Sequence, residues 1–186
     1  MKMGMKKREN GKGLAVKNHL SRSPSLVSTA YHEAGHAVIA YFEDIRNKGT
    51  SIEPEGDATG ICRLKNILLN INPKKDGTLH MRDKIERLAR VKLAGPIAQR
   101  LFSPAYYRPF HGQEDRRGAI DLLSYLADSK EELEAYMKLL HIQVTTKIES
   151  PVVWKAIKTV ATQLLKSTSL SGRELKEVIG QSIHVK

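Results

Sequence analysis

The 186-residue sequence contains a single cysteine, Cys62, which excludes an internal disulfide and any zinc site built from several cysteines. No apolar run approaches the roughly 18 residues that a membrane-spanning helix needs, and the mean hydropathy is −0.39. The basic start of the chain is not followed by an apolar segment, so it is not typical of a secretory signal. These absences favour a reducing compartment, and we expect a cytoplasmic protein without a transmembrane segment.

Charge is abundant but unevenly distributed. The sequence has 31 Lys and Arg against 20 Asp and Glu, a net charge of +11. Residues 1–23 hold seven of the basic residues and one acidic residue, which is +6 of that surplus. We interpret 1–23 as a basic, disordered leader and 24–186 as one folded domain. An electrostatic arm for nucleic acid is the alternative, but no interleaved aromatics or zinc knuckle supports it, and we do not expect nucleic acid as a partner.

Apolar periodicity predicts a mainly α-helical fold with a small β-sheet. The last helix begins with a predicted capping box, in which Ser171 and Glu174 exchange hydrogen bonds. Two short strands are expected between turn-forming residues in the first half of the domain. The predicted helices cover about 24–44, 79–102, 113–128, 131–148, 151–167 and 171–180, and the predicted strands cover 50–54 and 59–69.

The first predicted helix contains an H-E-x-x-H motif, His32-Glu33-Ala34-Gly35-His36. Residues four apart lie on one helical face, so both imidazoles can reach a single ion at about 2.0–2.1 Å. Zinc lowers the pKa of a bound water towards about 7, and Glu33 is placed to act as the general base on that zinc-bound water. We therefore predict Zn²⁺ as cofactor, with His32 and His36 as ligands.

A catalytic zinc needs a third protein ligand and an open position for water. The glycine and third histidine that follow the motif in metzincins are absent, since Ile39 and Phe42 stand there. The ligand must therefore come from elsewhere, and spacing alone does not choose it. The candidates by chemistry are His80, His111, Glu114, Asp115, Asp121 and His141.

Several segments together resemble the peptidase domain of FtsH-type ATP-dependent zinc proteases. The segment TAYHEAGHAV, residues 29–38, resembles the zinc-binding helix of that family. The run TSIEP from Thr50, with Gly60 after it, resembles the next strand, and LAGPIAQRLF from Leu93 resembles the family's L-x-G-x-x-A-E-E helix end. Residues 161–165 and 170–175 are similar to its closing motif, so the resemblance covers roughly 26–180.

The resemblance implies an FtsH-peptidase-like helical zincin domain. It implies Asp115 as the third zinc ligand, because Asp115 is placed like the aspartate of the family, four residues before Ala119. It also implies that the strand around 59–65, with Gly60, Ile61 and Cys62, borders the cleft and pairs with an extended peptide substrate. A plain structural edge is the alternative interpretation of this strand.

The chain also departs from the family pattern. The P-loop motif G-x-x-x-x-G-K-[ST] is absent, so we expect no ATPase domain of its own. Gly112 precedes Asp115 by three residues instead of four, Glu114 replaces the usual Asn or Asp, and Gln99-Arg100 replaces the acidic pair.

The expected function is a zinc metalloendopeptidase that hydrolyses unfolded or short polypeptides without ATP. Polypeptide substrates are the expected partners, with a separate ATPase or a second copy of the chain as further candidates. The alternative is a catalytically silent zinc-binding module that regulates or partners a separate ATPase.

Overall fold

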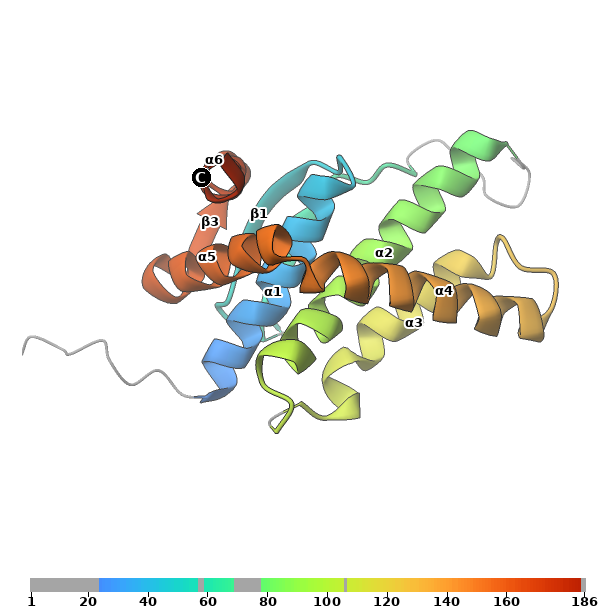
Figure 1. The fold of residues 1–186 in the computed structure, drawn as a ribbon, viewed down its shortest axis with the longest axis horizontal. Coiled ribbons are helices and arrows are strands. Elements are labelled where there is room, and N and C mark those ends of the chain that lie inside the picture. Colours follow the sequence, from blue (N-terminus) through green and yellow to red (C-terminus); the bar gives the residue numbers. More distant parts are fainter. Residues whose placement is uncertain (1–23, 57–58, 69–77, 106, 185–186) are drawn as a thin grey trace, which may run out of the picture.

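The computed structural model describes residues 24–56, 59–68, 78–105 and 107–184. Within these residues the predicted mainly α-helical class with a small sheet is confirmed, because the chain is mainly helical and carries one three-stranded sheet (Figure 1). The predicted leader, 1–23, lies outside the described residues. The helices are α1 (Pro24–Phe42), α2 (Leu79–Phe102), the short 3₁₀ turn η1 (Pro109–Gly112), α3 (Gln113–Leu123), α4 (Lys130–Glu149), α5 (Pro151–Ser167) and α6 (Gly172–His184), and the strands are β1 (Asn47–Ser51), β2 (Ile61–Leu64) and β3 (Ser169–Ser171).

Helix α1 is the centre of the fold, and it packs most extensively against α2 and α5 (Figure 1). Its core-facing side is built from small residues, including the fully buried Ala30 and Ala34. Small side chains let neighbouring helix backbones approach closely, so the face of α1 that carries the H-E-x-x-H motif lies directly against α2. Beyond that contact, Tyr31 stacks on Phe102 with ring centroids 3.7 Å apart.

The first helix ends two residues earlier than the sequence predicts. Asp44 adopts a left-handed backbone with φ of 52°. The Ile45 N–H then donates to the Ala40 carbonyl at 2.8 Å, which closes the helix end in the manner of a C-cap. This reversal sends the chain directly into β1.

The three strands form an antiparallel sheet in the order β2-β1-β3. The predicted strand at 50–54 is shifted, because β1 spans Asn47–Ser51 and includes residues that are typical of a turn. The Asn47 side chain accepts from the Gly49 N–H at 2.8 Å, and the register shifts between these two residues. The turn-forming residues are therefore accommodated as an irregularity within the strand.

Two further boundaries differ from the prediction. Strand β2 is shorter than 59–69, since it ends at Leu64 and the Asn66 side chain accepts from the Leu68 N–H in a local turn. Strand β3 is missing from the prediction, because three residues between two helices are too few for a period to show. The predicted capping box is confirmed: Ser171 N donates to Glu174 Oε2 at 2.7 Å and Glu174 N to Ser171 Oγ at 3.3 Å.

Helices α3 and α4 close the other side of α2. Helix α3 ends at Leu123 instead of continuing to about 128, and it packs on α2 through the buried Ala119 and Leu123. Helix α4 packs across α2 and buries Leu140 and Val144. The contact between α2 and α3 matters for the site, because it fixes the first turn of α3 beside α1. In the described part of the chain, no helix combines the length and the apolar character that crossing a bilayer requires.

Candidate metal centre

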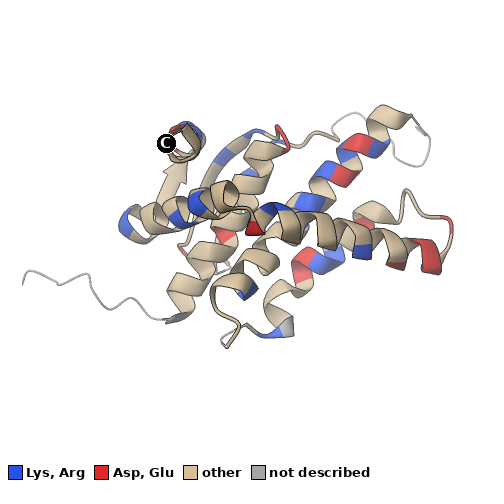
Figure 2. Cartoon of the chain, in the orientation of Figure 1, with Lys and Arg blue, Asp and Glu red and all other residues tan. Residues whose placement is uncertain are grey.

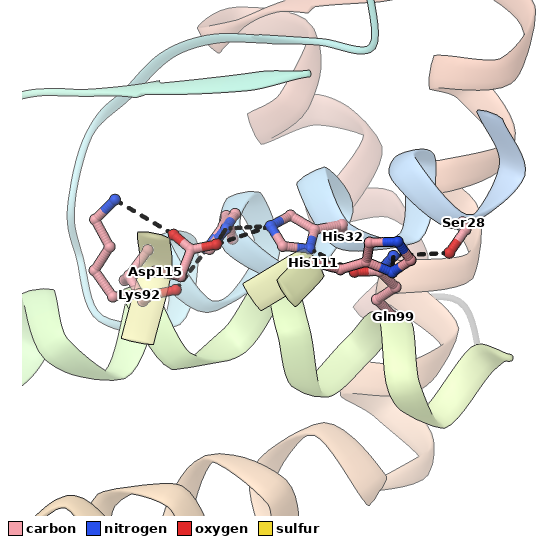
Figure 3. A network of polar contacts seen from close by, with 8 residues as sticks. Ser28, His32, Lys92, Gln99, His111 and Asp115 are labelled. Carbon is pink, nitrogen blue, oxygen red and sulfur yellow. Dashed lines mark hydrogen bonds and ion pairs between the residues drawn. The ribbon is translucent and has the colours of Figure 1, made fainter. Parts of the chain in front are cut away.

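Three side chains from two distant segments converge at one point between α1, α2 and α3 (Figure 3). His32 and His36 lie one turn apart on α1, with their Nε2 atoms 3.1 Å from each other. Asp115, in the first turn of α3, places Oδ2 2.9 Å from His32 Nε2 and 3.3 Å from His36 Nε2. Of the described residues, these are the three that group as a possible metal site.

These three separations suit one small ion. A tetrahedral site with bonds of about 2.0–2.1 Å has ligand atoms roughly 3.3 Å apart. The observed separations of 2.9, 3.1 and 3.3 Å are close to that value. Two imidazole nitrogens and one carboxylate oxygen are also a donor set that zinc uses in catalytic sites. The residues present therefore fit a zinc ion.

Each imidazole is oriented by a second hydrogen bond at its other nitrogen. His36 Nδ1 lies 2.7 Å from the Val91 carbonyl oxygen, and His32 Nδ1 lies 2.9 Å from Gln99 Oε1. A carbonyl oxygen only accepts, so each Nδ1 carries a proton. In the neutral ring, the lone pair then sits on Nε2 and faces the centre. Such contacts are the usual way in which a metal-binding histidine is held in position.

The three converging acceptor atoms repel one another electrostatically. Two unprotonated Nε2 atoms and a carboxylate oxygen are all acceptors, and acceptors this close repel one another unless a cation or a shared proton lies among them. Burial disfavours the charged carboxylate, but the facing His36 and His32 outweigh it and hold the pKa of Asp115 below its ordinary value. Burial lowers the pKa of His36, but Asp115 outweighs it and raises that pKa overall. The centre therefore favours a positively charged occupant.

Gly95 on α2 leaves the room that the imidazoles occupy. A Cβ at this position would lie 2.3 Å from His36 Nε2 and 2.8 Å from His32 Nε2. Both separations are shorter than real Cβ contacts, so any other residue would displace the rings. The glycine of the L-A-G-P segment is thus required by the close approach of the histidines to the backbone of α2.

Glu33 lies beside His32, His36 and Asp115, which we call the triad. All four line one cleft of about 850 Å³, which we call the metal cleft. Glu33 is 6% exposed, and burial raises the pKa of its carboxyl group above the ordinary value, although His36 and His32 lower it in part. A Cβ at Gly60 would lie 2.9 Å from Glu33 Oε1, so this glycine brings the backbone before β2 close to the carboxylate. Glu33 is therefore a buried carboxylate at the edge of the cleft.

The predicted substrate-binding residues line the same cleft. Gly60, Ile61 and Cys62 border it together with the triad and Glu33. Strand β2 pairs with β1 on one side and has no second neighbour among the described residues. The Cys62 thiol is tied back, because Asn47 Nδ2 donates to Sγ at 3.1 Å, and burial raises the pKa of this thiol to about 12. The raised pKa keeps this thiol in its neutral form at the edge of the cleft.

The other candidates for a third ligand do not reach the centre. His111 lines the cleft, but its Nδ1 lies 3.4 Å from Gln99 Nε2 and 3.3 Å from the Arg108 N–H. Glu114 has a side chain 86% exposed and pairs with Arg117. The remaining three lie outside the cleft, namely the exposed His80 and Asp121 and the half-buried His141.

Sequence reasoning missed two side chains that hold the centre in place. Gln99 is 6% exposed and connects His32 to Ser28, whose Oγ accepts from Gln99 Nε2 at 2.9 Å (Figure 3). Its position in the resemblance, where the family has an acid, could have drawn attention to it. Lys92 Nζ lies 3.4 Å from Asp115 Oδ1, and no motif pointed to this contact.

Comparisons with models of known protein families and with curated proteins find no match to this chain. The geometry and the chemistry of the centre are therefore the basis for a functional assignment.

Proposed function

We propose that this protein is a zinc-dependent peptidase of the kind that the FtsH-type peptidase domain represents. The observation that carries the proposal is the position of Glu33, a buried carboxylate in the same cleft as three converging metal-ligand atoms. His32, His36 and Asp115 would hold the ion, which leaves the cleft side open. When bound, Zn²⁺ supplies Lewis-acid chemistry that makes water a stronger acid and polarises a carbonyl group.

Glu33 is the residue that moves the proton. A raised pKa brings a carboxylate closer to the value at which it both accepts and releases a proton near neutral pH. In peptide hydrolysis the oxygen of water bonds to the carbonyl carbon and the C–N bond breaks. One proton of that water passes to a Glu33 carboxylate oxygen and then to the departing amine nitrogen. Atoms and charge balance with no other reactant.

Strand β2 supports an extended peptide as the substrate. Its free edge, among the described residues, borders the cleft at Gly60 and Ile61. An exposed strand edge offers backbone N–H and C=O groups that pair with an extended chain whatever its side chains. This favours unfolded or short polypeptides, because a folded substrate does not offer a free extended segment.

The test combines metal content with one matched pair of variants. The purified full chain is expected to bind one zinc per molecule and to cleave unfolded casein. Glu33→Gln is expected to keep zinc and to lose about 10²–10⁴-fold in rate. Glu114→Gln is the control, because Glu114 lines the same cleft but is exposed to water.

Three results would contradict the proposal. Absence of zinc binding in the wild-type protein would remove the metal centre altogether. Stoichiometric zinc without any cleavage, with or without an added ATPase, would support the silent zinc-binding module instead. A Glu33→Gln variant as active as Glu114→Gln would exclude Glu33 as the base.

A further inference from the structure

A second hollow of about 790 Å³ lies between the C-terminal end of α1, the start of β1 and α6. It shares no lining residue with the metal cleft. Buried aliphatic side chains, including Leu175 and Ile179 of α6, form its floor. Four cations form its rim. We call this hollow the basic groove and define its rim as Arg46, Lys48, Arg173 and Lys176.

The rim of the basic groove carries more positive than negative charge. All four rim residues are exposed, and none of them forms an ion pair with another described residue. Asp44 is the one carboxylate among the lining residues. Figure 2 shows Lys and Arg on β1 and on α6, the two elements that face each other here. Like charges gathered in a hollow raise the local concentration of anions.

The neighbouring cations of the fold behave differently. Glu43 is 9% exposed at its side chain, and it binds Arg90 at 3.2 Å and Lys147 at 2.8 Å. These ion pairs connect the residue that follows α1 to α2 and α4. The cations of the basic groove have no such internal partner in the described part of the chain, so their placement is not explained by the stability of the fold.

The two longer segments outside the described residues, 1–23 and 69–77, are not acidic. The leader, residues 1–23, carries a net charge of +6, and the segment 69–77 contains Lys74 and Lys75 against Asp76. Both would be repelled by the rim. The rim therefore favours an anionic occupant from another molecule over either of these segments.

The aliphatic floor and the pairing of β1 restrict which kinds of anion fit the groove. An aliphatic floor favours an occupant that carries apolar groups beside its charges. A nucleic-acid backbone would satisfy the rim but would offer the floor no apolar group. Strand β1 is paired on both sides, with β2 and with β3, so backbone pairing is not available inside the groove. Recognition there has to use side chains.

We propose that the basic groove is the docking site for an acidic segment of another protein, in which carboxylates alternate with aliphatic side chains. The carboxylates would contact the four rim cations, and the aliphatic groups would lie on the floor. This proposal is independent of the peptidase function, because it uses none of the residues of the metal cleft.

The experiment measures binding of a fluorescein-labelled peptide of repeated Glu-Glu-Leu-Leu units by anisotropy, using the full chain. We expect saturable binding that weakens as salt is raised, because salt screens exposed charges. The double variant Arg173→Glu/Lys176→Glu is expected to bind roughly tenfold or more weakly. A matching peptide with Gln in place of Glu is expected to bind as weakly to the wild-type protein.

The matched control is Lys158→Glu/Lys166→Glu, which changes the net charge equally at exposed positions of α5 outside the groove. This control is expected to bind the peptide within about twofold of wild type. Thermal unfolding of both double variants checks that they are folded. The milder Arg173→Gln/Lys176→Gln variant is expected to give an intermediate loss of peptide binding.

Three outcomes would overturn the proposal. The first is equal loss in the groove variant and in the α5 control, which would reduce binding to net charge. The second is tighter binding of a single-stranded oligonucleotide that the groove variant alone loses, which would assign the groove to nucleic acid. The third is concentration-dependent self-association of the wild type that the groove variant abolishes, which would make the groove an interface between copies.

Discussion

The metal cleft and the basic groove both border α1, but they hold their charged groups in opposite ways. In the cleft, His32, His36 and Asp115 are largely buried, and each is fixed by a second contact. In the groove, four cations are exposed to water, namely Arg46, Lys48, Arg173 and Lys176. Burial forces a polar group to find partners inside the protein, whereas an exposed cation is satisfied by solvent until an anion arrives.

Because of this difference, the two sites are expected to respond to different kinds of substitution. A buried, close-packed centre responds to changes of a single atom, because its ligand atoms cannot move. An exposed set of long, flexible side chains responds only to changes of charge, and salt weakens the response. The following predictions test that distinction.

The largest effect is expected from Gly95→Ala. The added Cβ would lie 2.3 Å from His36 Nε2, so the two imidazoles could no longer converge. We expect zinc binding to be lost at concentrations that saturate the wild type, as measured by titration with a competing chromophoric chelator. Gly180→Ala is the control, since a Cβ there meets nothing within 4 Å. Wild-type zinc affinity in Gly95→Ala would show that the imidazoles do not depend on the space beside Gly95.

The second prediction concerns Cys62, which lines the metal cleft. Because burial raises the pKa of this thiol to about 12, almost none of it is thiolate at neutral pH. An unfolded cysteine has a pKa of about 8.5. Alkylation by iodoacetamide at a pH of about 8 should therefore be on the order of 10³ times slower in the native chain than in urea. Native and unfolded rates within tenfold of each other would show that the cleft wall is open to water.

The third prediction separates positioning from packing at Gln99. Gln99→Ala removes the acceptor at His32 Nδ1, and we expect zinc affinity to fall about 10–100-fold. Gln99→Glu keeps an acceptor oxygen and should recover most of that affinity. A purely structural role would instead make both variants lose thermal stability while their zinc affinities stay alike. Arg100→Ala, at the exposed neighbouring position, controls for changes in the helix.

The smallest effect is expected on the zinc affinity of the metal cleft when residues of the basic groove are substituted. Arg173→Glu/Lys176→Glu should leave zinc affinity within about twofold of wild type, because the exposed charges are screened and share no contact with the triad. The same chelator titration measures it. A tenfold change would mean that the two hollows are energetically coupled.

Much of the helical framework was predictable from local pattern. Helices α2, α4 and α5 lie within a residue or two of their predicted bounds, because long amphipathic segments report their period directly. The strands were less predictable. Strand β1 contains turn-forming residues, and β3 has only three residues, so the pairing of these strands depends on neighbours that the local sequence does not reveal.

The candidate site divides in the same manner. The sequence alone left six candidates for the third ligand, and resemblance favoured Asp115. The structure brings Asp115 to the two histidines and leaves Glu114, one residue earlier, in water. Gln99 and Lys92 were not predicted as contacts, because nothing in their spacing relates them to the motif.

By itself, the sequence determined that two imidazoles and a carboxylate share one short segment, and the helical period places residues 32 and 36 on one face. This placement follows from the geometry of a single helix and requires no contact with another part of the protein. Spacing left six candidates for the third ligand, and the tertiary structure places Asp115, 83 residues from His32, 2.9 Å from the His32 Nε2 atom. It also decided that α6 brings Arg173 and Lys176 to the start of β1. Both depend on packing between distant segments, which no local period encodes.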